Sequence, residues 1–153
     1  MRMNSFHTIL LCCAMAVIGT AGAAESRPGQ LPTGVVPVHY DIRVEPDAEA
    51  LSFVGQVGID LEAQRATPTI TLNALDMEIS RATLDGSRAV TVAFDRAMQT
   101  TTLTFDEPVA PGRHRLEIDY TGRIQTTATG LFAVDYDTPA GARRVLTTQF
   151  EVA

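Results

Sequence analysis

The sequence has 153 residues, and its 12 Lys and Arg against 18 Asp and Glu give a formal net charge of −6 at pH 7. Every one of its basic residues is arginine. An acidic chain without a basic stripe argues against nucleic acid or an anionic membrane as a partner. The length is sufficient for one domain with its own hydrophobic core.

The first 23 residues have the pattern of a secretory signal peptide. Arg2 supplies a positive charge, residues 8–18 form an apolar core, and Ala21, Gly22 and Ala23 offer small side chains for cleavage. The apolar core is shorter than the ~20 residues that a membrane-spanning helix needs. We therefore expect a signal peptide over residues 1–23, export to the periplasm or secretion, and no membrane span in the mature chain. A retained N-terminal anchor is the alternative.

Cleavage after Ala23 leaves 130 residues with 11 arginines against 18 acidic residues. Cys12 and Cys13 depart with the signal, so the mature chain is expected to form no internal disulfide. This is compatible with a bacterial periplasm, where disulfides are permitted but not required.

Residues 24–37 are expected to form a linker, because its prolines and glycines disfavour regular structure. The domain expected at residues 38–153 consists of short segments with alternating apolar and polar residues, the pattern of half-buried β-strands. The clearest segment runs from His114 to Tyr120, and Asp85-Gly86 marks a hairpin turn. A loop is expected from Pro108 to Gly112, and no segment after the signal has helical periodicity over three turns.

We therefore predict an all-β fold, an antiparallel β-sandwich. Its core is expected to consist of alternate strand residues: Tyr40, Ile42, Val44, Ile59, Leu61, Ile70, Leu72, Val92, Phe94, Leu103, Leu116, Ile118 and Tyr120.

The last nine residues, 145–153, also alternate and predict a strand. Gln149 and Glu151 lie two residues apart, so both side chains are expected on one face of that strand. A polar face is most often simply solvated. The pattern by itself therefore leaves a binding role for these two residues as the less favoured alternative.

The segment Thr148-Gln-Phe-Glu151 resembles a segment of the zinc aminopeptidases of the aminopeptidase N type, peptidase family M1. The opening from Leu31 to Asp41, with its Leu-Pro and His-Tyr-Asp, resembles the start of that family's N-terminal β domain. Tyr120-Thr-Gly122 and Gly130-Leu-Phe132 are similar to two further segments of that domain. The resemblance implies a saddle-like β-sandwich that takes part in peptide binding.

The same resemblance implies roles for the closing strand. Glu151 would bind the α-ammonium group of a peptide N-terminus, and Gln149 would line the pocket for the first side chain. An aminopeptidase must recognise a free amine, and a carboxylate does so through a charge-assisted hydrogen bond. In the family, zinc and the catalytic residues belong to a further domain, so that missing catalytic domain is an expected partner of this chain.

No catalytic or metal-binding residue is predicted within this chain. Zinc aminopeptidases need two histidines one helical turn apart with a glutamate between them, and the mature chain offers only His39 and His114 on separate predicted strands. His39 is expected to be a strand-edge residue that is hydrogen-bonded locally, and His114 is expected to be a packed or capping residue. Asp135 and Asp137 provide too few oxygens for calcium and are expected in a solvated loop that turns at Pro139-Ala-Gly141.

Two hypotheses about function follow. In the first, the chain is an N-terminal, amine-reading fragment of an exported zinc aminopeptidase, cut before the last strands of its domain. In the second, it is a free-standing exported β-sandwich that binds a partner without catalysis. The first is favoured because two motifs occur in the family's order. A sandwich without its last strands is also expected to have open edges and to associate.

Overall fold

The structure is a computed structural model that describes residues 31–150, and this range contains ten β-strands and no helix. No helix in the described range is therefore long and apolar enough to cross a membrane. The strands are β1 (Val35–Asp47), β2 (Ser52–Ala63), β3 (Thr67–Asn73), β4 (Met77–Leu84), β5 (Arg88–Ala89), β6 (Thr91–Asp95), β7 (Thr100–Val109), β8 (Gly112–Arg123), β9 (Gly130–Thr138) and β10 (Gly141–Gln149).

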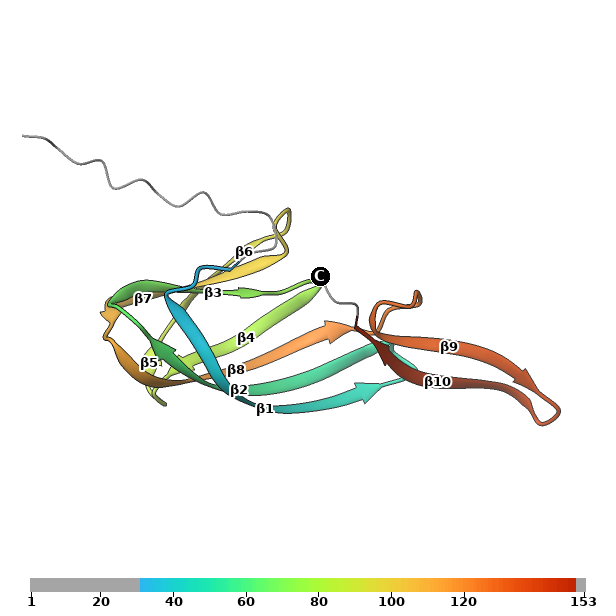
Figure 1. Ribbon diagram of the computed structural model, residues 1–153. Helices are drawn as coiled ribbons and strands as arrows, with labels where there is room; N and C mark the ends of the chain where they lie inside the picture. The colour runs from blue at the N-terminus through green and yellow to red at the C-terminus, as the bar shows by residue number, and fades with distance from the viewer. Residues whose placement is uncertain (1–30, 151–153) are drawn as a thin grey trace, which may run out of the picture.

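The strands form three antiparallel sheets. A five-stranded sheet has the order β1-β2-β8-β4-β5, and a three-stranded sheet has the order β3-β7-β6. The third sheet is the two-stranded β9–β10 hairpin. The three-stranded sheet lies over one end of the five-stranded sheet, and the hairpin projects from the other end (Figure 1). The predicted all-β antiparallel sandwich is confirmed. Every strand pair within both layers is antiparallel.

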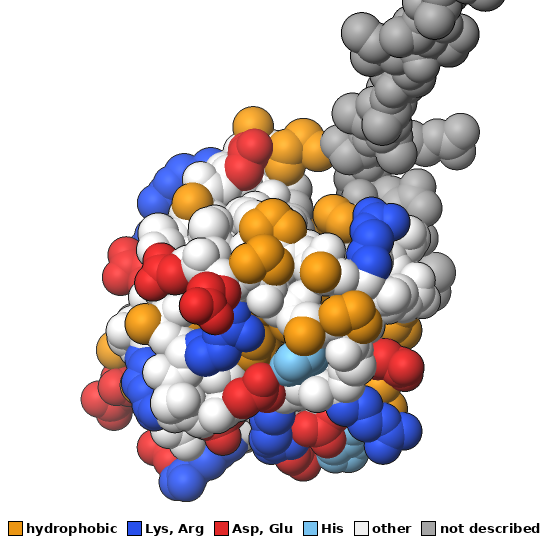
Figure 2. All heavy atoms as spheres, turned by 90° about the vertical axis from the view of Figure 1, so that its left-hand side faces the viewer, with side chains coloured by type: hydrophobic (Ala, Val, Ile, Leu, Met, Phe, Trp, Pro, Cys, Tyr) orange, Lys and Arg blue, Asp and Glu red, His pale blue; other side chains and the backbone are white. Residues whose placement is uncertain are grey.

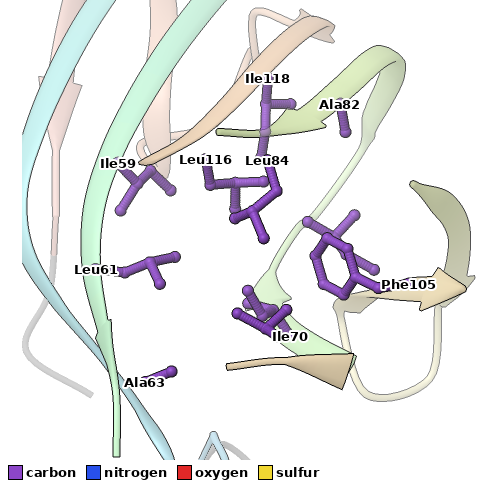
Figure 3. Close-up of a cluster of buried hydrophobic side chains, with 11 residues drawn as sticks. Ile59, Leu61, Ala63, Ile70, Ala82, Leu84, Phe105, Leu116 and Ile118 are labelled. Carbon is purple, nitrogen blue, oxygen red and sulfur yellow. The ribbon is translucent and has the colours of Figure 1, made fainter. Parts of the chain in front are cut away.

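The core lies between the two sheets. Leu84, Leu103, Leu116 and Val109 are completely buried. Side chains of β2, β4 and β8 point towards Ile70 and Phe105 of the opposite sheet (Figure 3). Alternation along β8 places Leu116 and Ile118 on this face and Glu117 outside, as expected for a strand that is covered on one side. The expected core residues on β2, β3, β7 and β8 are confirmed as buried or partly buried.

Four of the expected core residues are exposed, which corrects the sequence analysis. Tyr40, Ile42 and Val44 of β1 have relative exposures of 49%, 65% and 41%, and Phe94 of β6 has 43%. Both strands lie at the edge of their sheets. The alternation along β1 is correct, but its apolar side chains border an open groove and are not packed against the second sheet. A periodic pattern therefore identified the strand and its faces without determining their burial.

Two segment boundaries also differ from the expectation. β9 spans Gly130–Thr138, so Asp135 and Asp137 lie in a strand and not in a loop. The apolar–polar alternation that indicates a strand is weak here, because both faces of β9 are largely exposed beyond its base and polar side chains are tolerated on each. β7 continues to the buried Val109, which shortens the expected loop to two residues before Gly112.

Aromatic rings lie over glycines on the inner face of the larger sheet. Register pairs Gly55 with Tyr120 and Phe53 with Gly122. An added Cβ on Gly55 would meet the Tyr120 ring at 2.3 Å, and one on Gly122 would meet the Phe53 ring at 2.2 Å. The two rings contact edge to face with centroids 6.1 Å apart. Glycine is therefore required at both positions, because the rings occupy the space of a side chain.

The end of the sandwich opposite the hairpin has a mixed surface. Figure 2 shows acidic and basic side chains interspersed there, with hydrophobic groups between them. Opposite charges alternate across this face without a broad single-sign region. Such a surface is typical of a solvated end of a domain.

Candidate functional site

The predicted site residues belong to the returning strand of the projecting hairpin. β9 leaves the body at Gly130, the chain turns after Thr138, and β10 returns so that Gln149 pairs with Gly130. Gln149 is exposed at the base of the hairpin, on the face that also carries Thr147 and Phe132. The strand predicted at the end of the chain is confirmed as far as Gln149. Glu151 lies outside the described residues.

Backbone hydrogen bonds connect the base of the hairpin to the body. The N–H of Gln125 donates to the carbonyl of Leu131 at 2.9 Å, and the N–H of Ala133 donates to the carbonyl of Gln125 at 2.8 Å. The Gln125 amide also donates to Asp76 at 3.4 Å. Because Gly130 and Gln149 form the last pair of the ladder, this anchoring positions Gln149 next to the body.

One ion pair holds the hairpin against the body from its other face. Arg144 donates to both carboxylate oxygens of Asp135, at 2.6 Å and 2.8 Å, and to the carbonyl of Ala48 at 2.6 Å. Ala48 belongs to the β1–β2 connection, so a single guanidinium joins β9, β10 and that connection. The hydrogen bonds from Arg144 lower the pKa of Asp135 below its usual value. Asp135 therefore serves an ion pair, and its role is structural.

The hollow nearest this base does not contain Gln149. It has a volume of about 420 Å³ and lies between the start of β4, the end of β8 and the β6–β7 turn, with Asp76, Arg96 and Arg123 among its lining residues. Asp76 at its edge accepts a hydrogen bond from Gln125, whose backbone in turn bonds to Leu131 at the base of the hairpin. Gln149, the one predicted site residue within the described range, therefore lies on an open surface and not inside this hollow.

Both histidines of the described range are engaged by nearby groups. Nε2 of His39 lies 3.1 Å from an Asp41 carboxylate oxygen on the exposed side of β1. His114 contacts Asp85 through Nδ1 and the carbonyl of Ala110 through Nε2, both at 2.8 Å. The expected local hydrogen bond of His39 and the expected packed position of His114 are confirmed.

The contact between His114 and Asp85 shifts the pKa values of both side chains at the Asp85-Gly86 turn. The hydrogen bond with Asp85 raises the pKa of His114 above its usual value, against a smaller opposing effect of burial. Burial alone would raise the pKa of Asp85, but hydrogen bonds with His114 and with the N–H of Arg115 lower it overall. Asp85 and Gly86 both have positive φ, 51° and 79°, as the expected hairpin turn requires.

A network on the outer face of the larger sheet was missed by the sequence analysis. Arg115 of β8 donates to Asp60 of β2 and to Asp41 of β1, each at 2.7 Å. Its guanidinium lies over Gly58, where an added Cβ would be 2.2 Å from Nη2. Arg115, followed by His39, lowers the pKa of Asp41. Gly58 was the only sequence signal, because it leaves room for the Arg115 guanidinium from the neighbouring strand. Strand register, which pairs Arg115 with Asp60, is needed to see this.

Comparison with known proteins identifies the fold and places the hairpin in a family context. Residues 36–153 match the model of the peptidase M1 N-terminal domain. The chain belongs to the peptidase M1 family, through its N-terminal domain. The match covers all ten strands of this M1 domain apart from Val35, the first residue of β1.

Several aminopeptidases are similar to this M1 domain. It is 39% identical over 142 residues to aminopeptidase N of Acetobacter pasteurianus, covering 92% of this chain and 39% of that protein. It is 34% identical over 122 residues to aminopeptidase 2 of Candida albicans, covering 79% and 13%. It is 33% identical over 131 residues to human endoplasmic reticulum aminopeptidase 1, covering 80% and 14%. The chain thus spans well under half the length of these relatives.

The M1 family is zinc-dependent, so we tested whether this domain offers a zinc site. Residues 31–150 contain no group of three or more His, Cys, Asp or Glu side chains placed to hold a metal ion. His39 and His114 lie on different strands and already contact carboxylates. The described residues therefore do not fit zinc.

Proposed function

We propose that this chain is the N-terminal, substrate-amine-reading domain of an exported zinc aminopeptidase, which removes N-terminal residues from peptides. The observation that carries the proposal is the position of Gln149. A projecting strand returns it, exposed, to the base of a hairpin that backbone hydrogen bonds anchor to the body. Membership of the M1 N-terminal domain family supports the same role.

In this proposal Glu151 recognises the α-ammonium group of the substrate and Gln149 lines the pocket for its first side chain. A carboxylate suits the ammonium group because their hydrogen bond is charge-assisted. The amide of Gln149 is neutral and offers both a hydrogen-bond donor and an acceptor. It therefore suits a contact with the first side chain of the substrate and not with the charged ammonium group. The two residues therefore divide recognition between the chain terminus and the side chain.

Catalysis belongs to groups supplied from outside residues 31–150 in this proposal. The purified chain, assayed with an alanyl chromogenic substrate with and without added zinc, is expected to show no turnover. A chimera that replaces the matching segment of the Acetobacter pasteurianus aminopeptidase N with this chain is expected to hydrolyse the substrate. Zinc-dependent turnover by the chain alone would contradict the placement of the catalytic groups elsewhere.

The chimera also tests the two reading residues. We expect Glu151→Ala to lower kcat/KM roughly ten- to a hundredfold, corresponding to ~1.5–3 kcal/mol for a charge-assisted hydrogen bond. Gln149→Ala should cost markedly less, because only a neutral contact is removed. The measurement is kcat/KM for one free-amine peptide with the parent chimera and both variants.

The pH dependence provides the control for amine recognition. The effect of Glu151→Ala should be larger below the amine pKa of ~8 than above it, because only the protonated amine carries a charge. Acetylation of the substrate amine should remove the difference between the parent and the variant. Equal rates for both proteins with the free-amine peptide would exclude Glu151 from the site.

A further inference from the structure

β1 presents a long free edge. It lies at one end of the five-stranded sheet and pairs only with β2, so its other side has no strand beside it within the described residues. A free edge is a template for pairing with another chain, and proteins usually shorten, twist or cover such edges. Pro37 and Pro46 interrupt the edge near its two ends and leave residues 38–45 between them.

The register of β1 shows which backbone groups point outwards. Pro46 pairs with Phe53, and the positions paired in the same phase are Val44, Ile42 and Tyr40. In an antiparallel pair, alternate residues direct their N–H and C=O groups towards the partner or away from it. Proline has no N–H to donate, so its phase is the one that points away from β2. Tyr40, Ile42 and Val44 therefore offer donors and acceptors at the free edge.

The inner face of this edge is apolar and open. Tyr40, Ile42 and Val44 all point to the side that carries Val57 and Tyr120 on the neighbouring strands. A groove of about 340 Å³ lies along this face. Ile42, at 65% exposure, is the most exposed of the three edge residues. Pairing along the edge would bring two such apolar rows together.

Basic and acidic side chains alternate on the outer face of the edge. Within one copy, Arg43 already contacts Glu45, and Asp41 contacts Arg115 and His39. His39, Asp41, Arg43 and Glu45 follow one another at every second position. We propose that β1 pairs antiparallel with β1 of a second copy of this chain, with Ile42 opposite Ile42. In this register Asp41 faces Arg43 of the other copy, and His39 faces Glu45. Opposite charges across strands stabilise a pair, whereas like charges destabilise it.

The neighbouring registers are disfavoured by the same charges. A shift that places Asp41 opposite Asp41 also sets His39 against Arg43, and the reverse shift sets Arg43 against itself and Asp41 against Glu45. Ile42 lies on the twofold axis, so the interface is self-complementary, as a closed dimer requires. The apolar faces of both copies lie on the same side, and the two five-stranded sheets become one continuous sheet. This inference does not depend on the proposed function.

Single cysteines test both the dimer and its register. In a background with Cys12→Ser and Cys13→Ser, Ile42→Cys should form a disulfide-linked dimer under mild oxidation. Opposed strand residues lie within the Cα separation of ~4.4–6.8 Å that a disulfide spans. Tyr40→Cys and Val44→Cys, tested singly, should remain uncrosslinked, because each would face the other position and not itself. Crosslinking at residue 40 or 44 in place of 42 would overturn the register.

Sedimentation velocity tests the association without crosslinking. The unmodified chain should sediment as a concentration-dependent dimer. Arg43→Glu, which sets like charges against Asp41, should weaken association at least tenfold while its circular dichroism stays that of a β protein. Arg96→Glu, on the exposed β6–β7 turn, is the matched control and should dimerise like the unmodified chain. A monomer at all concentrations, open-ended aggregates, or equal association of both variants would overturn the proposal.

Discussion

At the scale of single residues, the His114–Asp85 contact makes stability depend on pH. The pKa of His114 is raised in the folded chain, so the contact stabilises the fold fully below the unfolded-state pKa of about 6.5. This contribution is lost as the pH rises through the higher folded-state value. His114 has a largely buried side chain, so solvent screens the contact less than it screens a surface pair.

We expect Asp85→Asn to lower the pKa of His114 and to remove this pH dependence. Asparagine keeps a side-chain oxygen to accept the N–H of Arg115, so the turn itself is retained. NMR titration of the His114 ring and urea unfolding at pH 5.5 and pH 8 measure both effects. His39→Gln, at an exposed histidine, should leave the pH dependence unchanged. An unaltered His114 titration in Asp85→Asn would contradict the assignment.

At the scale of elements, the hairpin depends on few contacts with the body. Its strands pair with each other, and hydrogen bonds of Gln125 and Arg144 connect it to the rest of the described fold. An element with few buried contacts opens locally at low free energy. The position of Gln149 at its base therefore depends on these contacts more than on the core.

Arg144→Ala is expected to loosen the hairpin without unfolding the sandwich. Removal of the guanidinium leaves Asp135 without its partner and frees the carbonyl of Ala48. Amide hydrogen exchange should accelerate in β9 and β10 by about tenfold, while β2 and β8 stay protected. Arg143→Ala, on the opposite face of the hairpin, is the control and should change exchange little. Equal acceleration throughout the chain would indicate global destabilisation.

At the scale of the whole molecule, the open inner face of the larger sheet should be detectable in solution. The groove beside Ile42 and Tyr120 is lined mainly by apolar groups, with Leu72 and Thr101 of the three-stranded sheet among its lining residues. Ile42 remains 65% exposed at its edge. Whole domains are stable by only ~5–15 kcal/mol, and no disulfide is expected to reinforce this one. Exposed apolar surface therefore favours association and dye binding.

We expect the chain to bind the dye ANS under native conditions and to unfold at a midpoint that depends on protein concentration. The chimera with the Acetobacter pasteurianus enzyme is the comparison, and its N-terminal domain should bind less dye if the added segments cover the groove. Fluorescence and thermal unfolding at several concentrations measure these effects. A sharp, reversible, concentration-independent transition from a monomer without dye binding would show a closed domain.

The sequence by itself determined the elements that depend on local chemistry. Period-2 alternation predicted β2 and β8 and the inner position of Leu116 and Ile118, because side chains of a strand alternate between its faces. Asp85-Gly86 predicted its turn because both positions require positive φ. The closing strand and the position of Gln149 on it were also predictable, since they too follow from alternation.

The tertiary structure alone decided which faces are covered. Ile42 and Ile118 follow the same pattern, yet Ile42 is exposed and Ile118 is buried, because β8 packs against the second sheet whereas β1 lies at the edge of its own sheet. β9 was missed since a projecting hairpin has no layer to select apolar residues on either face. The Arg115 network and the Arg144 bridge join residues 55 to 96 positions apart in sequence. Such contacts depend on register and sheet order, which no local pattern contains.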